Sequence, residues 1–123
     1  MSWNVDAAVL YLDTHASSHS LGRCAEYTRT AIEHGGLLVQ RHTSAKDYGN
    51  SLELDGFVEV GTHNDHDYKK GDVAIIQPIP GHPHGHMAMF DGHQWVSDFK
   101  QRTLYPGPSY RAYAPSYKVY RHP

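Results

Sequence analysis

Apolar residues recur at helical spacing in the first third of the chain. Asn4 can cap a first helix, which we predict over residues 5–15, where apolar positions repeat every three or four residues. A second helix is predicted over residues 23–34, closed by Gly35 and the glycine that follows it. Residues 43–52 are predicted to form a short third helix that Ser or Thr caps at its start.

The second half of the chain has the pattern of short strands. Residues 71–78 open with a Gly-Asp turn and continue as an apolar run, which suits a buried central strand. Residues 86–90 and 94–99 form a predicted hairpin around an Asp-Gly turn, and residues 57–60 and 117–121 are further strand candidates. Helices followed by antiparallel strands predict an α+β fold, with N-terminal helices packed on an antiparallel sheet.

Length and composition narrow the possible functions. With 123 residues and 13.9 kDa, the chain is predicted to form one domain over residues 1–123. A single cysteine excludes an intrachain disulfide and a multi-cysteine metal site. The net charge of −2, without a Lys/Arg run, gives no basis for nucleic-acid binding. No apolar run is long enough for a membrane span and no signal peptide opens the sequence, so we expect synthesis as a soluble cytoplasmic protein.

Cys24 stands where the second predicted helix begins. In the first turn of a helix, unpaired backbone N–H groups and the helix dipole favour the thiolate, which is the nucleophilic form of cysteine. A free cysteine is more often a small buried apolar residue. A catalytic role therefore requires a base and a third polar group elsewhere in the chain.

The predicted hairpin supplies both groups. If its loop consists of the three residues 91–93, His86 lies opposite Asp98 on the neighbouring strand. Asp98 would then accept the imidazole N–H, and His86 would form an ion pair with the Cys24 thiolate. A two-residue turn would instead place His86 opposite Ser97, so this prediction depends on the register of the hairpin.

The order of these elements, a helix that begins with Cys24, a strand that begins with His86 and a following strand with Asp98, resembles the NlpC and CHAP families of papain-like cysteine hydrolases. Residues 22–27 are similar to the nucleophile helix of these families, residues 71–76 to the strand that Gly-Asp introduces, and residues 85–92 to the histidine strand. The resemblance spans residues 21–99, about two thirds of the chain. Two positions depart from the family pattern. Arg-Cys-Ala replaces the common Asp-Cys-Ser, and the third residue is Asp98, where His, Asn, Gln or Glu is more usual.

The resemblance implies a papain-like fold and hydrolysis of an amide bond in bacterial peptidoglycan, either within the stem peptide or between muramic acid and L-alanine. Cys24 would attack the carbonyl, and backbone N–H groups at its helix start would stabilise the oxyanion. His86 would protonate the leaving amine and then activate water, with Asp98 as the third catalytic residue and without a cofactor. Further candidates for the oxyanion site and the cleft walls are Ser20, His19, Tyr27 and Trp95.

A bare catalytic domain without a signal peptide or wall-binding module resembles the toxins that contact-dependent machines deliver, such as type VI secretion effectors. A small phage lysis enzyme also fits. The expected partners are peptidoglycan or a muropeptide as substrate and a cognate immunity protein. The protein would act on the wall in the periplasm or outside the cell, after export by a route that reads no N-terminal signal.

Metal binding is the main alternative, because neutral imidazole is a common ligand for zinc, nickel or copper. Five histidines lie in the relevant segments: His63, His66, His82, His84 and His86. Pro83 and Gly85 favour a loop here, however, and a stable site would need further ligands and supporting carboxylates. A non-catalytic binding module on the same fold is the third possibility.

Overall fold

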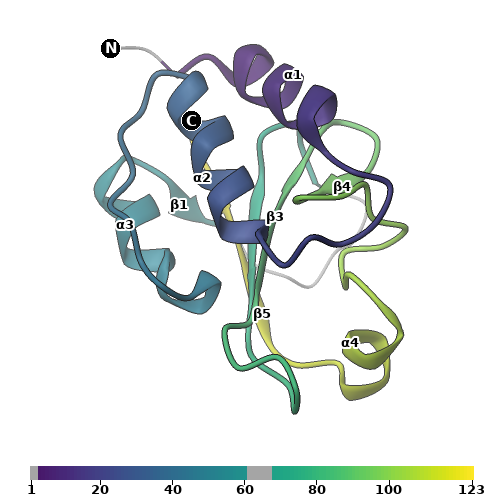
Figure 1. Cartoon of the computed structure of the whole chain (residues 1–123). Coiled ribbons are helices and arrows are strands. Elements are labelled where there is room, and N and C mark those ends of the chain that lie inside the picture. Colours follow the sequence, from purple (N-terminus) through teal and green to yellow (C-terminus); the bar gives the residue numbers. More distant parts are fainter. Residues whose placement is uncertain (1–2, 61–67) are drawn as a thin grey trace.

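The computed structural model describes residues 3–60 and 68–123 (Figure 1). Its helices are α1 (Val5–His15), α2 (Cys24–His34), the 3₁₀ turn η1 (Ala45–Asp47), α3 (Gly49–Leu54) and α4 (Pro108–Tyr113). Its strands are β1 (Val58–Glu59), β2 (Val73–Ile76), β3 (His86–Phe90), β4 (Trp95–Val96) and β5 (Tyr117–Arg121). The strands form one antiparallel sheet in the order β1-β5-β2-β3-β4. The predicted α+β class is confirmed.

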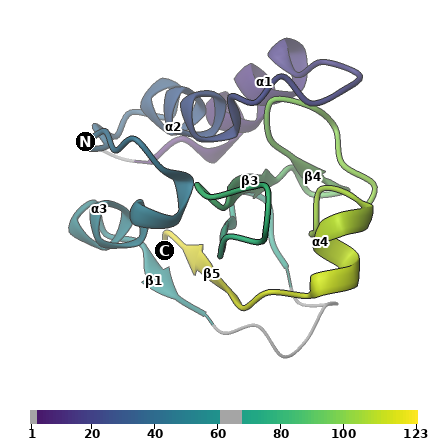
Figure 2. The same ribbon diagram turned by 60° about the horizontal axis from the view of Figure 1, so that its bottom comes forward.

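Helix α1 begins at the predicted cap. The Oδ1 atom of Asn4 accepts a hydrogen bond from the backbone N–H of Ala7 at 3.0 Å, which satisfies one of the free donors of the first turn. Its buried face carries Ala8, Val9 and Leu12. Figure 2 shows α1 and α2 side by side as a layer that covers one face of the sheet. None of the helices among the described residues is long and apolar enough to cross a membrane.

Strand β2 is buried along its whole length, as its apolar run predicts. Its side chains alternate between two faces. Val73 and Ile75 pack into the cluster under α1 and α2, whereas Ala74 packs with Trp95 and Val119 on the opposite face. Each fully buried Val or Ile side chain contributes about 1.5–3 kcal/mol of hydrophobic stabilisation. The central strands are therefore firmly anchored, and they hold the residues at their ends in fixed positions.

The β3–β4 hairpin has a register that differs from the predicted one. Phe90 pairs with Trp95, so the loop is one residue longer than expected. The side chain of Asp91 determines this loop, because its Oδ1 accepts the backbone N–H groups of His93 at 2.8 Å and Gln94 at 2.7 Å. The predicted three-residue loop is therefore wrong, and so is the cross-strand pairing derived from it.

Three further elements differ from the sequence-based expectation. The predicted third helix is divided into η1 and α3. Helix α3 begins at Gly49, where a Cβ would press on the Tyr120 hydroxyl. Helix α4 was not predicted, although Gly107 followed by proline at the first helical position is a known start signal. The predicted strand 94–99 ends at Val96, because the chain turns sharply there: the N–H of Ser97 donates to the carbonyl of Phe99 at 2.9 Å.

Candidate active site

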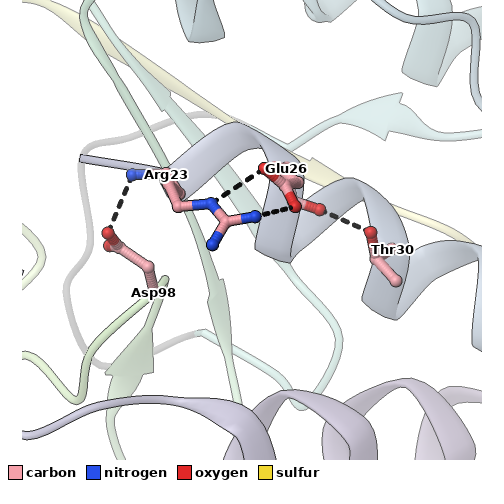
Figure 3. A network of polar contacts seen from close by, with 4 residues as sticks. All are labelled: Arg23, Glu26, Thr30 and Asp98. Atoms are coloured by element: carbon pink, nitrogen blue, oxygen red, sulfur yellow. Dashed lines mark hydrogen bonds and ion pairs between the residues drawn. The ribbon is translucent and has the colours of Figure 1, made fainter. Parts of the chain in front are cut away.

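Cys24 is the first residue of α2, as predicted, and a buried carboxylate holds the segment before it. The Oδ2 atom of Asp98 accepts the backbone N–H of Leu21 at 2.7 Å. It also accepts the backbone N–H of Arg23 at 2.9 Å, as Figure 3 shows. Asp98 is fully buried, and the hydroxyl of Ser97 donates to its other oxygen at 3.2 Å. The carboxylate thus fixes the turn that presents Cys24 at the start of the helix.

His86 is the first residue of β3, and the packing of α2 on β3 brings it to the same cavity as Cys24. The Thr28 hydroxyl of α2 donates to the carbonyl of Met87 at 3.4 Å, next to His86. Gly85 has a φ of +71°, and a Cβ at this position would collide with the carbonyl oxygen of Ile76. Because only glycine fits there, the backbone enters β3 at a fixed angle that directs His86.

The side chain that binds His86 is Gln101. The Nε2 atom of His86 lies 2.7 Å from the Oε1 atom of Gln101, and both residues are buried. The amide nitrogen of Gln101 donates to the carbonyls of Thr103 and Leu104, each at 3.0 Å, so its oxygen must face the imidazole. An amide oxygen only accepts, which means that His86 carries its proton on Nε2. The Nδ1 atom is then the basic nitrogen.

Sequence analysis predicted that Asp98 orients His86, but in the structure Asp98 does not bind the imidazole. Val96 is the last residue of β4, and the chain beyond it turns, which directs the Asp98 carboxylate to the N–H groups before α2 and not to the imidazole. Sequence reasoning missed Gln101. It lies in an irregular segment, where side-chain direction follows no period, although a glutamine soon after the histidine hairpin matches the residue types that the resembled families use at the third position.

Cys24 and His86 line a cavity of about 400 Å³. Burial raises the pKa of the Cys24 thiol to about 11, although backbone N–H groups, first that of Met87, act in the opposite direction. Burial also lowers the pKa of His86, against the hydrogen bond with Gln101 and the charge of Asp98. Both directions favour a neutral thiol beside a neutral imidazole. Burial of the two groups thus opposes the expected thiolate–imidazolium ion pair.

The other residues predicted for the cleft fall in different places. Ser20 lines the cavity together with Cys24, and its hydroxyl oxygen accepts the N–H of Gly22 at 3.4 Å. His19 is exposed and does not line this cavity, and Tyr27 lies beneath the Arg23 guanidinium. Trp95 is buried against Tyr68 and Phe90 in the cluster on the other face of the sheet, so its predicted role in the cleft is wrong.

Tyr110 completes the wall of this cavity opposite the sheet. It belongs to α4, is almost fully buried, and its ring lies 5.4 Å from the ring of His82 and 6.1 Å from that of His86. With Pro83, Pro106 and Pro108 it gives this side of the cavity a predominantly apolar surface.

The histidines proposed as metal ligands bind separate partners. The Nδ1 atom of His84 is 2.5 Å from the Ser44 hydroxyl, His86 binds Gln101, and His82 contacts Tyr110. Among residues 3–60 and 68–123, the side chains form no group of three or more His, Cys, Asp or Glu that could hold a metal ion. His63 and His66 lie outside the described residues.

No family model matches the chain, and no curated protein matches it either. Solved structures do match, and among them are two of the type VI effector–immunity complex Tae3–Tai3 from Ralstonia pickettii. The native form is 51% identical, with a TM-score of 0.90, and the match covers 98% of this chain and 100% of that one. The selenomethionine form is 53% identical, with a TM-score of 0.86 and coverage of 94% and 99%.

The chain belongs to the Tae3 family of type VI effectors. A further match, Ly7917, has a TM-score of 0.56 at 14% identity and covers 94% of this chain and 61% of that one. At this identity it shows a shared fold alone. The match to Tae3 shows the family as well as the fold, because half of the residues are identical over nearly the whole length of both chains.

Proposed function

We propose that this Tae3-family protein is a cysteine hydrolase that cuts an amide bond in the peptide part of peptidoglycan. The observation that carries the proposal is the shared cavity of Cys24 and His86, in which the proton of His86 is fixed on Nε2 by Gln101 and Nδ1 is left as a base. A cysteine beside an oriented imidazole is the arrangement that acyl transfer requires.

The first step starts from the neutral pair. As the Cys24 sulfur attacks the carbonyl carbon, the thiol proton passes to Nδ1 of His86, and the C–S bond forms while the carbonyl oxygen becomes an oxyanion. Gln101 stabilises the resulting imidazolium by accepting its Nε2–H. The substrate triggers this transfer, because the developing negative charge moves from sulfur to an oxygen that hydrogen-bond donors can reach.

The oxyanion has two sources of hydrogen bonds. The first is the backbone N–H of Cys24 at the start of α2, which faces its own sulfur and is not used by Asp98. The second is the hydroxyl of Ser20, whose oxygen already accepts the Gly22 N–H. His86 then gives its proton to the leaving amine, and it later deprotonates the water that releases the acyl group from Cys24.

Asp98 supports this chemistry through the backbone. It binds the N–H groups of Leu21 and Arg23, so it holds the nucleophile in place, and its charge reaches the imidazole without a hydrogen bond to it. This role replaces the one that sequence analysis gave it, and it keeps Asp98 among the residues of the proposed site with Cys24 and His86.

The family supports the biological setting of the proposal. The Ralstonia Tae3 structures are effector–immunity complexes, so we assign this chain a type VI antibacterial effector role, with action on the cell wall of a target cell in the periplasm. A cognate immunity protein is the expected partner in the producing cell. The residue-level resemblance to cysteine hydrolases of peptidoglycan points to the same substrate.

Digestion of purified peptidoglycan tests the proposal. Wild-type protein should release new muropeptides, whose masses identify the bond that is cut, and Cys24→Ser and His86→Ala should release none. Leu38→Ala is a matched surface control, because Leu38 is 81% exposed and does not line the cavity that Cys24 shares with His86. Release of the same fragments by Cys24→Ser would overturn the proposed mechanism.

A further inference from the structure

A second cavity lies on the other side of Cys24. It has a volume of about 790 Å³ and shares Gly22, Cys24 and His84 with the first cavity. Its walls come from the first turns of α2 and from the segment 41–48. The two cavities therefore adjoin at Cys24, and a substrate bound there can extend into both.

The second cavity is polar, in contrast to the apolar first one. Its charged residues are Arg23, Glu26, Arg29, Arg41 and Asp47. Four of these five are neutralised by partners. Glu26 binds Arg23 at 2.6 Å (Figure 3), Arg29 binds Glu33 at 3.1 Å, and Asp47 binds Lys46 at 3.0 Å.

Arg41 is the remaining charge. It is exposed, and its guanidinium forms no hydrogen bond or ion pair with any residue in the described ranges 3–60 and 68–123. It lies within electrostatic reach of the start of α2: after the hydrogen bond from Arg23, the charges of Arg29 and Arg41 also lower the pKa of Glu26. The cavity beside Cys24 thus contains one cation whose planar donor group is available to a ligand.

We infer that the second cavity is the subsite for a carboxylate-bearing part of the substrate and that Arg41 is the residue that recognises this carboxylate. A guanidinium matches a carboxylate with two parallel hydrogen bonds, which gives both attraction and orientation. This inference rests on the proposed function, because it concerns the peptide that Cys24 would attack.

The position of His86 indicates which part of the substrate enters this subsite. His86 must reach the nitrogen of the leaving amine, and it lines the first cavity but not the second. The leaving amine therefore lies on the side of the first cavity. The second cavity takes the acyl part, which stays bound to Cys24 after the first step, and Arg41 would hold a free carboxylate on this part.

Two stem peptides that differ in one group test the inference. They carry the bond identified in the peptidoglycan digest, and they are identical except that the free carboxylate on the acyl side is amidated in one of them. Wild-type protein should cleave the carboxylate form with a kcat/KM about two- to fivefold higher, as expected for an exposed charge pair. Arg41→Gln should lower the kcat/KM for the carboxylate form alone and so remove the preference, and Arg41→Lys should keep part of it.

Arg102→Gln is the matched control, because Arg102 is also an exposed arginine and lines neither of the two cavities beside Cys24. It should retain the full preference. An unchanged preference in Arg41→Gln would overturn the inference while leaving the proposed function intact. A preference that depends on a carboxylate of the leaving amine would overturn the assignment of the acyl side. If the wild type cleaves neither peptide, the proposed function itself fails.

Discussion

The Nε2 atom of His86 lies 2.7 Å from the Oε1 atom of Gln101, and two backbone carbonyls hold the amide nitrogen of Gln101. This chain of hydrogen bonds sets the direction of each donor, so it decides which imidazole nitrogen carries the proton. Nδ1 is then the basic nitrogen of an imidazole that lines the same cavity as Cys24.

Replacing Gln101 with Met should lower kcat/KM about 10- to 100-fold, because the imidazole loses the acceptor that fixes its tautomer. Gln101→Glu should behave differently. A carboxylate beside the imidazole favours its charged form and raises the pKa of His86, so the acidic limb of the kcat/KM profile should move to higher pH. Gln77→Met is the control for a glutamine that binds neither Cys24 nor His86. A Gln101→Met variant with wild-type kcat/KM would contradict the orienting role.

Asp98 should matter first for stability. Asp98→Ala leaves the N–H groups of Leu21 and Arg23 without their acceptor, and we expect a loss of about 1–3 kcal/mol in the free energy of unfolding. Urea denaturation measures this loss. Asp98→Asn keeps one side-chain oxygen and should lose less. Glu53→Gln, at an exposed acidic residue, should change the stability by less than about 0.5 kcal/mol. Equal stability of Asp98→Ala and wild type would contradict the account.

The raised pKa of Cys24 predicts slow alkylation at neutral pH. Burial raises this pKa to about 11, so the thiol is protonated in the free protein and only a small fraction is thiolate. The rate of alkylation by iodoacetamide should keep rising with pH beyond the range in which an ordinary cysteine titrates. A rate that reaches its plateau near pH 6 would instead demonstrate a preformed thiolate–imidazolium pair.

We expect the free energy of unfolding to depend on pH through Asp13, which lies beside Asp91. Burial, and then the hydrogen bond with Asp91, raise the pKa of Asp13 to about 6. A raised pKa means that the folded state favours the protonated form of Asp13. The contribution of Asp13 to the free energy of unfolding is therefore complete below about pH 3.8, and it is lost as the pH rises through about 6.

Asp13→Asn imitates the protonated form and tests this directly. It should therefore raise the free energy of unfolding at pH 7.5, by roughly 0.5 kcal/mol because solvent screens a partly exposed pair. At pH 3.5 it should have no such effect. Chemical denaturation at the two pH values measures the difference, and an equal effect at both values would contradict the raised pKa of Asp13.

The places of Cys24 and His86 in the fold were predictable from local signals. Cys24 follows a turn and precedes a helical pattern, and His86 opens a strand with a strong apolar pattern, so both positions could be read from a few neighbouring residues. Helix α1 and strand β2 were predictable for the same reason. In these elements the local propensity and the tertiary packing favour the same structure.

The register of the hairpin was not predictable in this way. It depends on the side chain of Asp91, which binds the N–H groups of His93 and Gln94 and so adds one residue to the loop. Because strand faces alternate, one extra residue changes every pairing beyond it. Gln101 was missed because it approaches His86 from an irregular segment, where only the three-dimensional path of the chain determines the direction of a side chain.

The covalent intermediate provides the most direct test that Cys24 is the nucleophile of an amide hydrolase. Protein mixed with peptidoglycan fragments, quenched with acid within the first turnover and digested with trypsin should show an acylated peptide 24–29. Its added mass should equal the acyl part of the cleaved peptide, as a thioester requires. Cleavage that proceeds without this adduct, and that persists in Cys24→Ser, would contradict the account.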